Sequence, residues 1–223
     1  MAILRRSMTY TPLDAATLQR WKAVPPAVAG DCMNRDRCMD STVSPLGEGM
    51  VMVGHARTVS VMAGDNSAVH AVLPLLQPGE VLVITAGGAG EVAIIGEIIA
   101  ECAMARGCAG IVLDGAVRDV GSLRAMSMPI YATGATPRGP HKGFGGEIDA
   151  PIACGGVVVE PGDLVLGDDD GICVVPAARL AEVLVQGEAQ VAKEADIIAK
   201  VRSGVTTAEL SGMAVPEPTD AAG

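Results

Sequence analysis

A strand, a helix and a second strand are expected in close succession between residues 80 and 114, and they constrain the fold more than any other part of the chain. Glu80–Thr85 reads EVLVIT, an apolar run of strand length. The glycine-rich stretch AGGAG follows it, and Ala93–Arg106 then carries isoleucines at helical spacing. Gly110–Leu113 is a second apolar run. Strands that alternate with a helix favour an α/β fold.

Composition favours one domain with an aliphatic core. Hydrophobic residues make up 49% of the 223 residues, whereas aromatic residues make up only 2%. The core is therefore expected to consist of Val, Ile, Leu, Ala and Met. A chain of this length can bury one large core, and no repeat or linker divides it. We expect a single compact domain over residues 1–223, with a flexible polar tail from about residue 205.

The other elements are predicted from hydrophobic periodicity and from the positions of Pro and Gly. We expect helices at Leu13–Arg37, broken at Pro25-Pro26, and at Ala68–Leu76, Val117–Ala125 and Pro176–Val201. We expect strands at Met50–Ala56, Arg57–Ala63, Pro129–Thr133, Val157–Val159, Leu164–Gly167 and Ile172–Val175. The DDDG between the last two strands predicts a hairpin turn, because the rest of a calcium-binding loop pattern is missing.

Charge and cysteine usage exclude several function classes. The chain has 16 basic and 26 acidic residues and a net charge of −10, with no basic stripe, so nucleic-acid binding is not expected. The sequence contains neither a membrane-spanning apolar run nor an apolar segment after its first arginines, so no membrane association or secretion is expected. The six cysteines form no CxxC pair. This favours free thiols in a cytoplasmic protein over disulfides or zinc ligands.

Arg118 and Asp119 stand side by side soon after the apolar run that ends at Leu113. Ligands of open α/β folds bind beyond the carboxyl ends of the strands, which would make this pair part of a site. A surface ion pair at a strand-to-helix turn would give the same pattern. Glu97 precedes Arg118 by one helix, a turn and a strand. This spacing can bring Glu97 to the same place.

Carboxylates at such a site would suit a hard cation. Glu97, Asp119 and also Asp114 offer oxygen ligands, which Mg²⁺ and Mn²⁺ prefer. The glycine-rich stretch lacks both the Walker A ending and a GxGxxG fingerprint, so nucleotide binding is only weakly indicated. Backbone amides near Gly96–Ile99 could still bind a small anion if the helix begins there. The absence of GxSxG disfavours a serine hydrolase.

Two long segments carry a resemblance to a known family. They are GEIIAECAMARGCAGIVLDGAVRDVGSLRAMSMPIYATGATPRG and CGGVVVEPGDLVLGDDDGICVVP. They resemble the family that joins 4-hydroxy-4-methyl-2-oxoglutarate (HMG) aldolases, 4-carboxy-4-hydroxy-2-oxoadipate (CHA) aldolases and RraA-type regulators of ribonuclease E. The resemblance runs from about Asp31 to Gly204. It implies an RraA-like fold of the swivelling β/β/α type, a mixed β-sheet sandwich or barrel flanked by helices.

The resemblance also implies roles for individual residues. Asp119 would anchor Mg²⁺ or Mn²⁺, and Glu97 would hold waters bound to that ion. Glu97 stands where the family usually has Asp, and the longer side chain changes its reach. Arg118 would bind the carboxylate or keto oxygen of the pyruvyl group. It would do so together with backbone amides, which are those of Gly96, Glu97, Ile98 and Ile99.

Assembly is implied in the same way. The family forms trimers or hexamers with sites between subunits. Asp31 and Glu194 correspond to acids that enter the site from a neighbouring subunit, although Asp31 replaces a Glu.

These expectations describe a class II, metal-dependent pyruvate aldolase acting on a 4-hydroxy-2-oxo dicarboxylic or tricarboxylic acid. Cleavage leaves the pyruvate enolate, whose charge a metal can stabilise. A Schiff-base lysine would be the alternative, but it needs an apolar surrounding that lowers its pKa. None of the four lysines lies in an apolar strand; they are Lys22, Lys142, Lys193 and Lys200. Decarboxylation of oxaloacetate passes through the same enolate and is expected as a side activity.

Two other functions remain open at this point. The first is a non-catalytic regulator that binds ribonuclease E, which the retained Asp119 disfavours because the regulators tend to lose that Asp. The second is a related enzyme that shares only the enolate chemistry. The residues that would bind the distal end of the substrate are not evident. Arg138, His141 and Lys142 are candidates, but a mobile basic loop fits them equally well.

Overall fold

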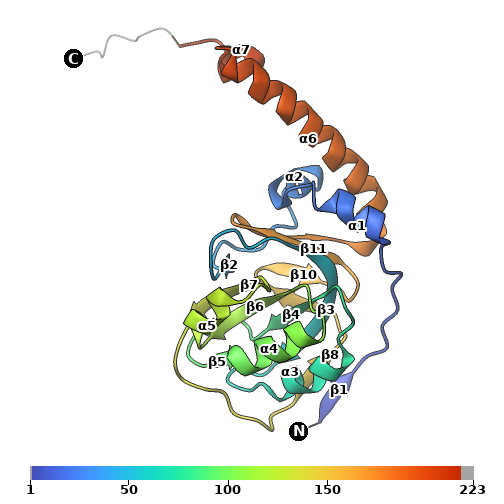
Figure 1. The fold of residues 1–223 in the computed structure, drawn as a ribbon, viewed down its shortest axis with the longest axis vertical. Helices are drawn as coiled ribbons and strands as arrows, with labels where there is room; N and C mark the ends of the chain where they lie inside the picture. The colour runs from blue at the N-terminus through green and yellow to red at the C-terminus, as the bar shows by residue number, and fades with distance from the viewer. Residues whose placement is uncertain (1, 217–223) are drawn as a thin grey trace, which may run out of the picture.

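The computed structural model describes residues 2–216, in which a ten-stranded mixed sheet forms the centre of the molecule (Figure 1). The strands are β1 (Ile3–Arg5), β2 (Ser44–Pro45), β3 (Met52–Val61), β4 (Glu80–Thr85), β5 (Ala93–Ile95), β6 (Gly110–Val117), β7 (Ile130–Ala135), β8 (Gly146–Ile148), β9 (Ile152–Cys154), β10 (Val157–Val159), β11 (Leu164–Asp168) and β12 (Gly171–Val175). The helices are α1 (Ala15–Trp21), α2 (Pro26–Cys32), α3 (Ser67–Val72), α4 (Glu97–Ala105), α5 (Val120–Ala125), α6 (Leu180–Arg202) and α7 (Thr207–Leu210), with short 3₁₀ turns η1 (Leu73–Leu75) and η2 (Ala177–Arg179).

Parallel strands make up the middle of the sheet. Its main path runs β1-β8-β3-β4-β6-β7-β2, and the pairs β3–β4, β4–β6 and β6–β7 are parallel. The short strand β5 also pairs in parallel with β6. The hairpin β11–β12 adds antiparallel pairing, because β11 also pairs with β3. The α/β class and the mixed sheet predicted from the sequence are therefore confirmed.

Alternate residues of the central strands pack into two different cores. On β4, Leu82 and Ile84 face the helices α3, α4 and α5, which lie over one face of the sheet in Figure 1. Val81 and Val83 face the opposite side, where β9, β10 and β12 cover them. A sheet covered on both faces needs apolar residues at every strand position, which explains the continuous run EVLVIT.

A third core lies under the N-terminal helices. Trp21 of α1 and Val28 of α2 pack there against Leu184 of α6 and residues of β11 and β12. Beyond this contact α6 projects away from the body, and its far end carries α7 (Figure 1). The tail expected from about residue 205 thus begins with a four-residue helix, capped by Thr206 and Glu209. Residues 217–223 of that tail lie outside the described residues.

The start of helix α4 differs from the expectation, and this difference affects the site. The helix predicted over Ala93–Arg106 begins only at Glu97, and Ala93–Ile95 forms strand β5. The run Val92–Ile95 is apolar and too short for its periodicity to distinguish strand from helix. Pairing with β6, and a hydrogen bond from Ala93 N to Arg138 O of 2.8 Å, select the strand.

Other boundaries differ because the backbone pairing extends or ends elements irrespective of local pattern. The two strands expected over residues 50–63 form one strand, β3. Strand β6 continues to Val117, so the helix expected at Val117–Ala125 begins at Val120. The region Leu13–Arg37 contains two seven-residue helices. Four short strands were not expected, namely β1, β2, β8 and β9.

The hairpin turn at DDDG is confirmed, since Asp168 and Gly171 form the last pair of β11 and β12. All six cysteines are free, as expected; Cys108, Cys154 and Cys173 are buried.

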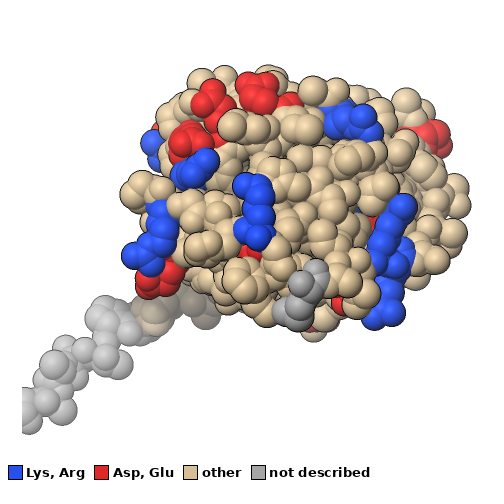
Figure 2. Space-filling model, turned by 90° about the horizontal axis from the view of Figure 1, so that it is seen from below, with Lys and Arg blue, Asp and Glu red and all other residues tan. Residues whose placement is uncertain are grey.

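Within residues 2–216, no helix is long and apolar enough to cross a membrane. On the face in Figure 2, Lys and Arg side chains are spread over the surface rather than gathered in one patch.

Candidate functional site

Arg118 and Asp119 lie at the carboxyl end of β6, where the chain reverses into α5. Arg118 N donates to Ile95 O over 3.0 Å, and Thr136 N donates to Val117 O over 2.9 Å, so both neighbouring strands fix this strand end. Asp119 then adopts the left-handed conformation with φ of 60°, which is uncommon for a residue other than Gly. The Arg118 and Asp119 side chains remain 42% and 41% exposed. The turn therefore presents both side chains at the surface.

The amino end of α4 meets this turn. Glu97 N donates to Asp119 Oδ2 over 3.2 Å, so Asp119 caps a helix that Gly96 itself cannot cap. Arg118 Nε lies 3.5 Å from the same oxygen. A Cβ on Gly96 would lie 2.4 Å from Asp119 Oδ2 and 2.9 Å from Arg118 Cγ. Only glycine at position 96 permits this close approach.

The first turn of α4 leaves backbone amides available. The leading N–H groups of a helix have no intrahelical acceptor. Glu97 N is bonded to Asp119, but those of Ile98 and Ile99 have no acceptor among the described residues. Such amides and the helix dipole favour an anionic group. The helix expected over Ala93–Arg106 thus begins at Glu97, which meets the condition under which the amides near Gly96–Ile99 could bind an anion. The side chain of Ile98 is 78% exposed there.

A cavity of about 360 Å³ adjoins the pair. It is lined by Arg118, Asp119, Val120, Ala135, Thr136 and Pro137. The loop after β7 also packs on the arginine, since a Cβ on Gly139 would lie 2.7 Å from Arg118 Nη1. Thr136, Pro137 and Gly139 were not among the residues expected at the site. The glycine in the PRG stretch was the available signal, but its contact with Arg118 depends on the tertiary fold.

The oxygen ligands at this site suit a hard divalent cation. Asp119 Oδ1 and the exposed carboxylate of Glu97 have no partner among residues 2–216. Mg²⁺ is usually held by one or two carboxylates and several waters. No group of three or more His, Cys, Asp or Glu side chains within the described residues could hold a metal by itself. The donor set therefore fits Mg²⁺ or Mn²⁺ with water and substrate as further ligands, and does not fit an all-protein metal site.

Asp114 faces away from this group. Its Oδ2 accepts a hydrogen bond from Gly155 N over 3.4 Å, and its Oδ1 lies beside Gly88. Both partners are loops outside the Arg118 cavity. No contact joins Asp114 to Asp119 within the described part of the chain.

Asp31 and Glu194 lie at the other end of the molecule. Asp31, on α2, forms an ion pair with Arg35 over 3.2 Å, and Glu194, on α6, accepts from Gln190 over 2.8 Å. In Figure 1, α2 and α6 lie at the opposite end from α4 and α5. A single chain therefore does not bring these acids to Arg118.

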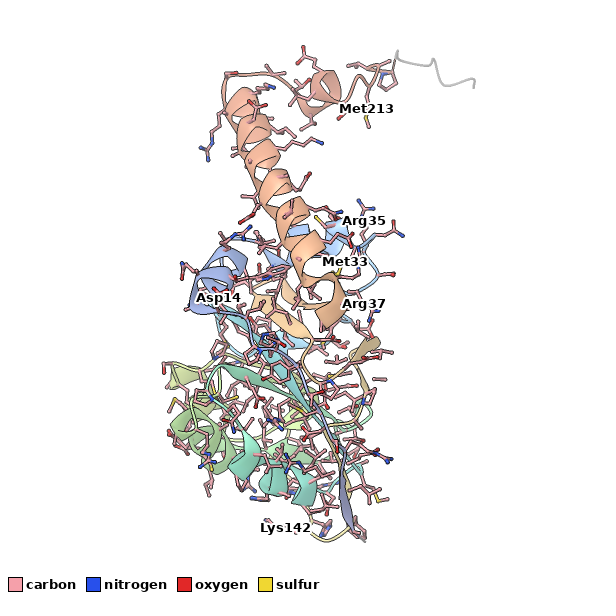
Figure 3. The ribbon with its side chains drawn as sticks, turned by 90° about the vertical axis from the view of Figure 1, so that its right-hand side faces the viewer. Asp14, Met33, Arg35, Arg37, Lys142 and Met213 are labelled. Carbon is pink, nitrogen blue, oxygen red and sulfur yellow. The ribbon has the colours of Figure 1, made fainter. Side chains whose placement is uncertain are left out.

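The basic loop offers only one residue near the site. Arg138 is adjacent to Gly139, its carbonyl holds β5, and its side chain is 68% exposed with a loose ion pair to Glu91 at 3.8 Å. His141 is held through its backbone by Gly64 and Asn66. Lys142 lies at the end of the molecule remote from Arg35 and Arg37 (Figure 3).

The remaining histidines have structural surroundings. The ring of His55 is buried, with Nδ1 2.8 Å from Gly162 O and Nε2 accepting from Leu13 N over 3.0 Å. Burial lowers the pKa of His70, and the positive charge of Lys142 lowers it further. Neither histidine lines the cavity at Arg118.

Known proteins resemble this chain over most of its length. A protein of Halalkalibacterium halodurans with the name "Putative 4-hydroxy-4-methyl-2-oxoglutarate aldolase" is 37% identical over 196 residues, which are 88% of this chain and 91% of that protein. The structure of an uncharacterized protein from Pseudomonas syringae is similar with a TM-score of 0.79 at 26% identity, covering 90% of this chain and 95% of the other.

A third relative belongs to the RraA-type proteins. Streptomyces coelicolor RraAS2, described as an unusual member of the RNase ES inhibitor RraA protein family, has a TM-score of 0.74 at 31% identity. The match covers 86% of this chain and 100% of the Streptomyces chain. The family model RraA-like, described as Aldolase/RraA, matches residues 23–174. Sequence, fold and matched length together show that the chain belongs to the RraA-like aldolase/RraA family.

Proposed function

We propose that the chain is a cytoplasmic, divalent-metal-dependent aldolase. It cleaves a 4-hydroxy-2-oxo dicarboxylic or tricarboxylic acid of the HMG or CHA type to pyruvate and a second oxo acid, a carbon–carbon lyase reaction. Decarboxylation of oxaloacetate is a side activity because it forms the same enolate. The names of the relatives support the reaction class, and the arrangement of Arg118, Asp119 and the amino end of α4 supports the site.

One observation carries the proposal. An arginine and a carboxylate line one small cavity at the carboxyl end of a parallel strand, and the amino end of α4, with its free amides, meets the same carboxylate. This is where ligands of α/β folds bind. A 2-oxo acid presents a carboxylate and a keto oxygen side by side, and both bear negative charge as the enolate develops. Arg118 offers positive charge and N–H donors for these oxygens, and the neighbouring amino end of α4 offers further N–H groups.

Arg118 is the residue that binds and orients the substrate. Its guanidinium can donate two parallel hydrogen bonds to a carboxylate, a geometry that a lysine does not provide. The loop at Gly139 packs on Nη1 and limits the rotation of the side chain. Because the strand end and this loop are both fixed, the guanidinium of Arg118 needs little reorganisation when negative charge develops on the substrate.

Asp119 and Glu97 would hold the metal. Asp119 would bind it directly through the oxygen that the helix cap leaves unused, and Glu97 through bound water. A divalent cation bound there acts as a Lewis acid on the keto oxygen. Retro-aldol cleavage also needs a base for the C4-hydroxyl proton. No histidine among the described residues lines the cavity, so we do not assign that role to one.

Asp31 and Glu194 would complete the site from a neighbouring copy in a trimer or hexamer. Both acids lie away from Arg118 within one chain, so they would reach its site only from another copy.

The experiment is release of pyruvate from a small panel of hydroxy-oxo acids. Purified protein with Mg²⁺ releases pyruvate, and EDTA stops the reaction. Arg118→Ala lowers the rate roughly a hundred- to thousandfold, the usual loss of one electrostatic stabiliser. Arg124→Ala is the matched control, because that arginine donates to Leu46 O over 2.6 Å and does not line the cavity. Wild-type turnover in Arg118→Ala would refute the site.

The second candidate is a non-catalytic regulator of ribonuclease E. The likeness to Streptomyces coelicolor RraAS2, at 31% identity, favours it. Capture of ribonuclease E by the purified protein, together with no metal-dependent pyruvate release, would support this function over the aldolase.

A further inference from the structure

We propose that Cys38 and Cys173 form a site of reversible disulfide formation. Cys38 lies in the segment after α2, and Cys173 lies in β12. The two residues form an isolated antiparallel β-bridge. This site is separate from Arg118 and does not depend on the proposed reaction.

The backbone around the two residues fixes how they face each other. Met39 N donates to Ile172 O, and Val174 N donates to Arg37 O, each over 2.9 Å. These bonds flank the Cys38–Cys173 pair without involving its own amides, so the pair is of the non-hydrogen-bonded type. Such pairs have Cα atoms about 4.5 Å apart with their side chains on the same face. Disulfides span Cα separations of about 4.4–6.8 Å. The backbone therefore needs no movement to accept the bridge.

The sulfur atoms occupy the same small space. A Cβ on Gly30 would lie 2.5 Å from Cys38 Sγ and 3.9 Å from Cys173 Sγ. Both thiols thus lie against the backbone of α2, at a position where only glycine leaves room for them. Burial raises the pKa of Cys173, and the neighbouring Cys38 raises it further through charge and a side-chain hydrogen bond.

The two thiols differ in access, which gives them different roles. Cys38 is exposed, whereas Cys173 is buried. Cys38 can therefore meet a reagent from solution, and Cys173 can react only with its neighbour. Elsewhere, the buried thiols of Cys108 and Cys154 donate to backbone carbonyls.

The reaction that we infer uses an oxidised low-molecular-weight disulfide. The Cys38 thiolate attacks one sulfur of the reagent, which forms a mixed disulfide and expels one reagent thiolate. Cys173 attacks Cys38 Sγ and gives up its proton to the departing thiolate, which forms the protein disulfide and releases the second reagent thiol. The protein gives up two electrons and two protons, and the reagent disulfide gains them as two thiols. The bridge would join β12 to the segment after α2, the helix that carries Asp31.

The test is oxidation of the whole protein with glutathione disulfide, followed by alkylation of the remaining thiols and peptide mapping. Trypsin cuts after Arg37 and so separates Cys38 from Cys32. A second protease that cuts before aspartate separates Cys173 from Cys154, because Asp163 lies between them. We expect one linked pair that contains Cys38 and Cys173, and its loss on treatment with dithiothreitol.

Variants make the result specific. Cys38→Ser, at an exposed position, abolishes the link and leaves Cys173 as a free thiol. Cys102→Ser, also at an exposed position, leaves the link intact. The proposal is overturned if Cys38 is recovered only as its glutathione adduct, if it pairs with Cys32 or with a second chain, or if Cys173 becomes oxidised equally in Cys38→Ser.

Discussion

Gly96 and Asp119 illustrate how single residues shape the proposed site. Asp119 needs a left-handed backbone to turn its carboxylate onto the amino end of α4. Gly96 needs to lack a side chain so that this carboxylate and Arg118 can approach. The Asp119 carboxylate can reach Glu97 N only because position 96 is a glycine.

We predict that Gly96→Ala abolishes most of the activity while the protein stays folded. The new methyl group would displace the Asp119 carboxylate or the Arg118 side chain, and displacements of about 1 Å at a reacting centre can cost roughly a hundredfold in rate. The matched control is Gly121→Ala on α5, where a Cβ meets nothing within 4 Å. Pyruvate release and the thermal midpoint of both variants check this. Equal rates in the two variants would contradict the account.

At this scale the sequence predicts residues that stand out chemically. Arg118 and Asp119 are conspicuous because two charged residues closely follow an apolar strand, and their place at its carboxyl end is confirmed. Gly139 and Thr136 are not conspicuous, because their importance comes from contacts with a strand end remote in sequence. The roles of all these residues in catalysis stay predictions.

The turn between β3 and α3 is the element that holds the loop beyond the site. Asp65 is fully buried, and its carboxylate accepts from Ser67 N over 2.8 Å and from Phe144 N over 3.1 Å. Asn66 N donates to His141 O over 3.2 Å. These bonds fix the return of the loop that also contains Arg138.

Asp65→Ala should destabilise the protein in a pH-dependent way. Burial alone would raise the pKa of Asp65, but hydrogen bonds from Ser67 and Phe144 lower it below the ordinary 3.8. A lowered carboxyl pKa contributes stability above about pH 4, and this is lost as the pH falls through the folded-state value. We expect a loss of about 1–3 kcal/mol at pH 7, the cost of unsatisfied buried hydrogen-bonding groups.

Urea unfolding at pH 7 and at pH 3 measures this difference. The difference in the free energy of unfolding between wild type and Asp65→Ala should be smaller at pH 3 than at pH 7. Glu48→Ala serves as the control, since Glu48 is exposed and has no ion pair or hydrogen bond within the described residues. A gap that is constant with pH would show that the carboxylate charge does not matter.

Element types follow well from periodicity in long segments and poorly in short ones. The predictions of α6, β4 and the β11–β12 hairpin are confirmed because each has a long run or a clear turn. Strand β5 was expected as helix because three apolar residues carry no period. Short strands such as β1 and β8 form because they pair with strands distant in the sequence: β1 pairs with β8, and β8 also pairs with β3.

The molecule as a whole separates two groups of acids. Arg118, Asp119 and Glu97 lie at one end, and Asp31 and Glu194 lie at the other. A closed ring of subunits can bring such distant surfaces together at each interface. Sequence patterns predict the fold of one chain, but the proposed shared site would depend on contacts between chains.

A mixing experiment tests the shared site. Arg118→Ala and Glu194→Gln should each be nearly inactive alone. After joint dissociation and reassembly, about a quarter of the activity should return, because random mixing places two intact halves at one interface in four. Simple addition of the two residual activities, with no recovery, would contradict a site between subunits.

The most direct test of the central claim is pyruvate release by Asp119→Asn in the presence of Mg²⁺. Asparagine keeps the shape and can still accept the hydrogen bond from Glu97 N, so α4 stays capped. It removes only the charge that we propose to hold the metal. We predict a rate at least a hundred- to thousandfold below wild type with an unchanged thermal midpoint. Wild-type pyruvate release by this variant would contradict the proposed site.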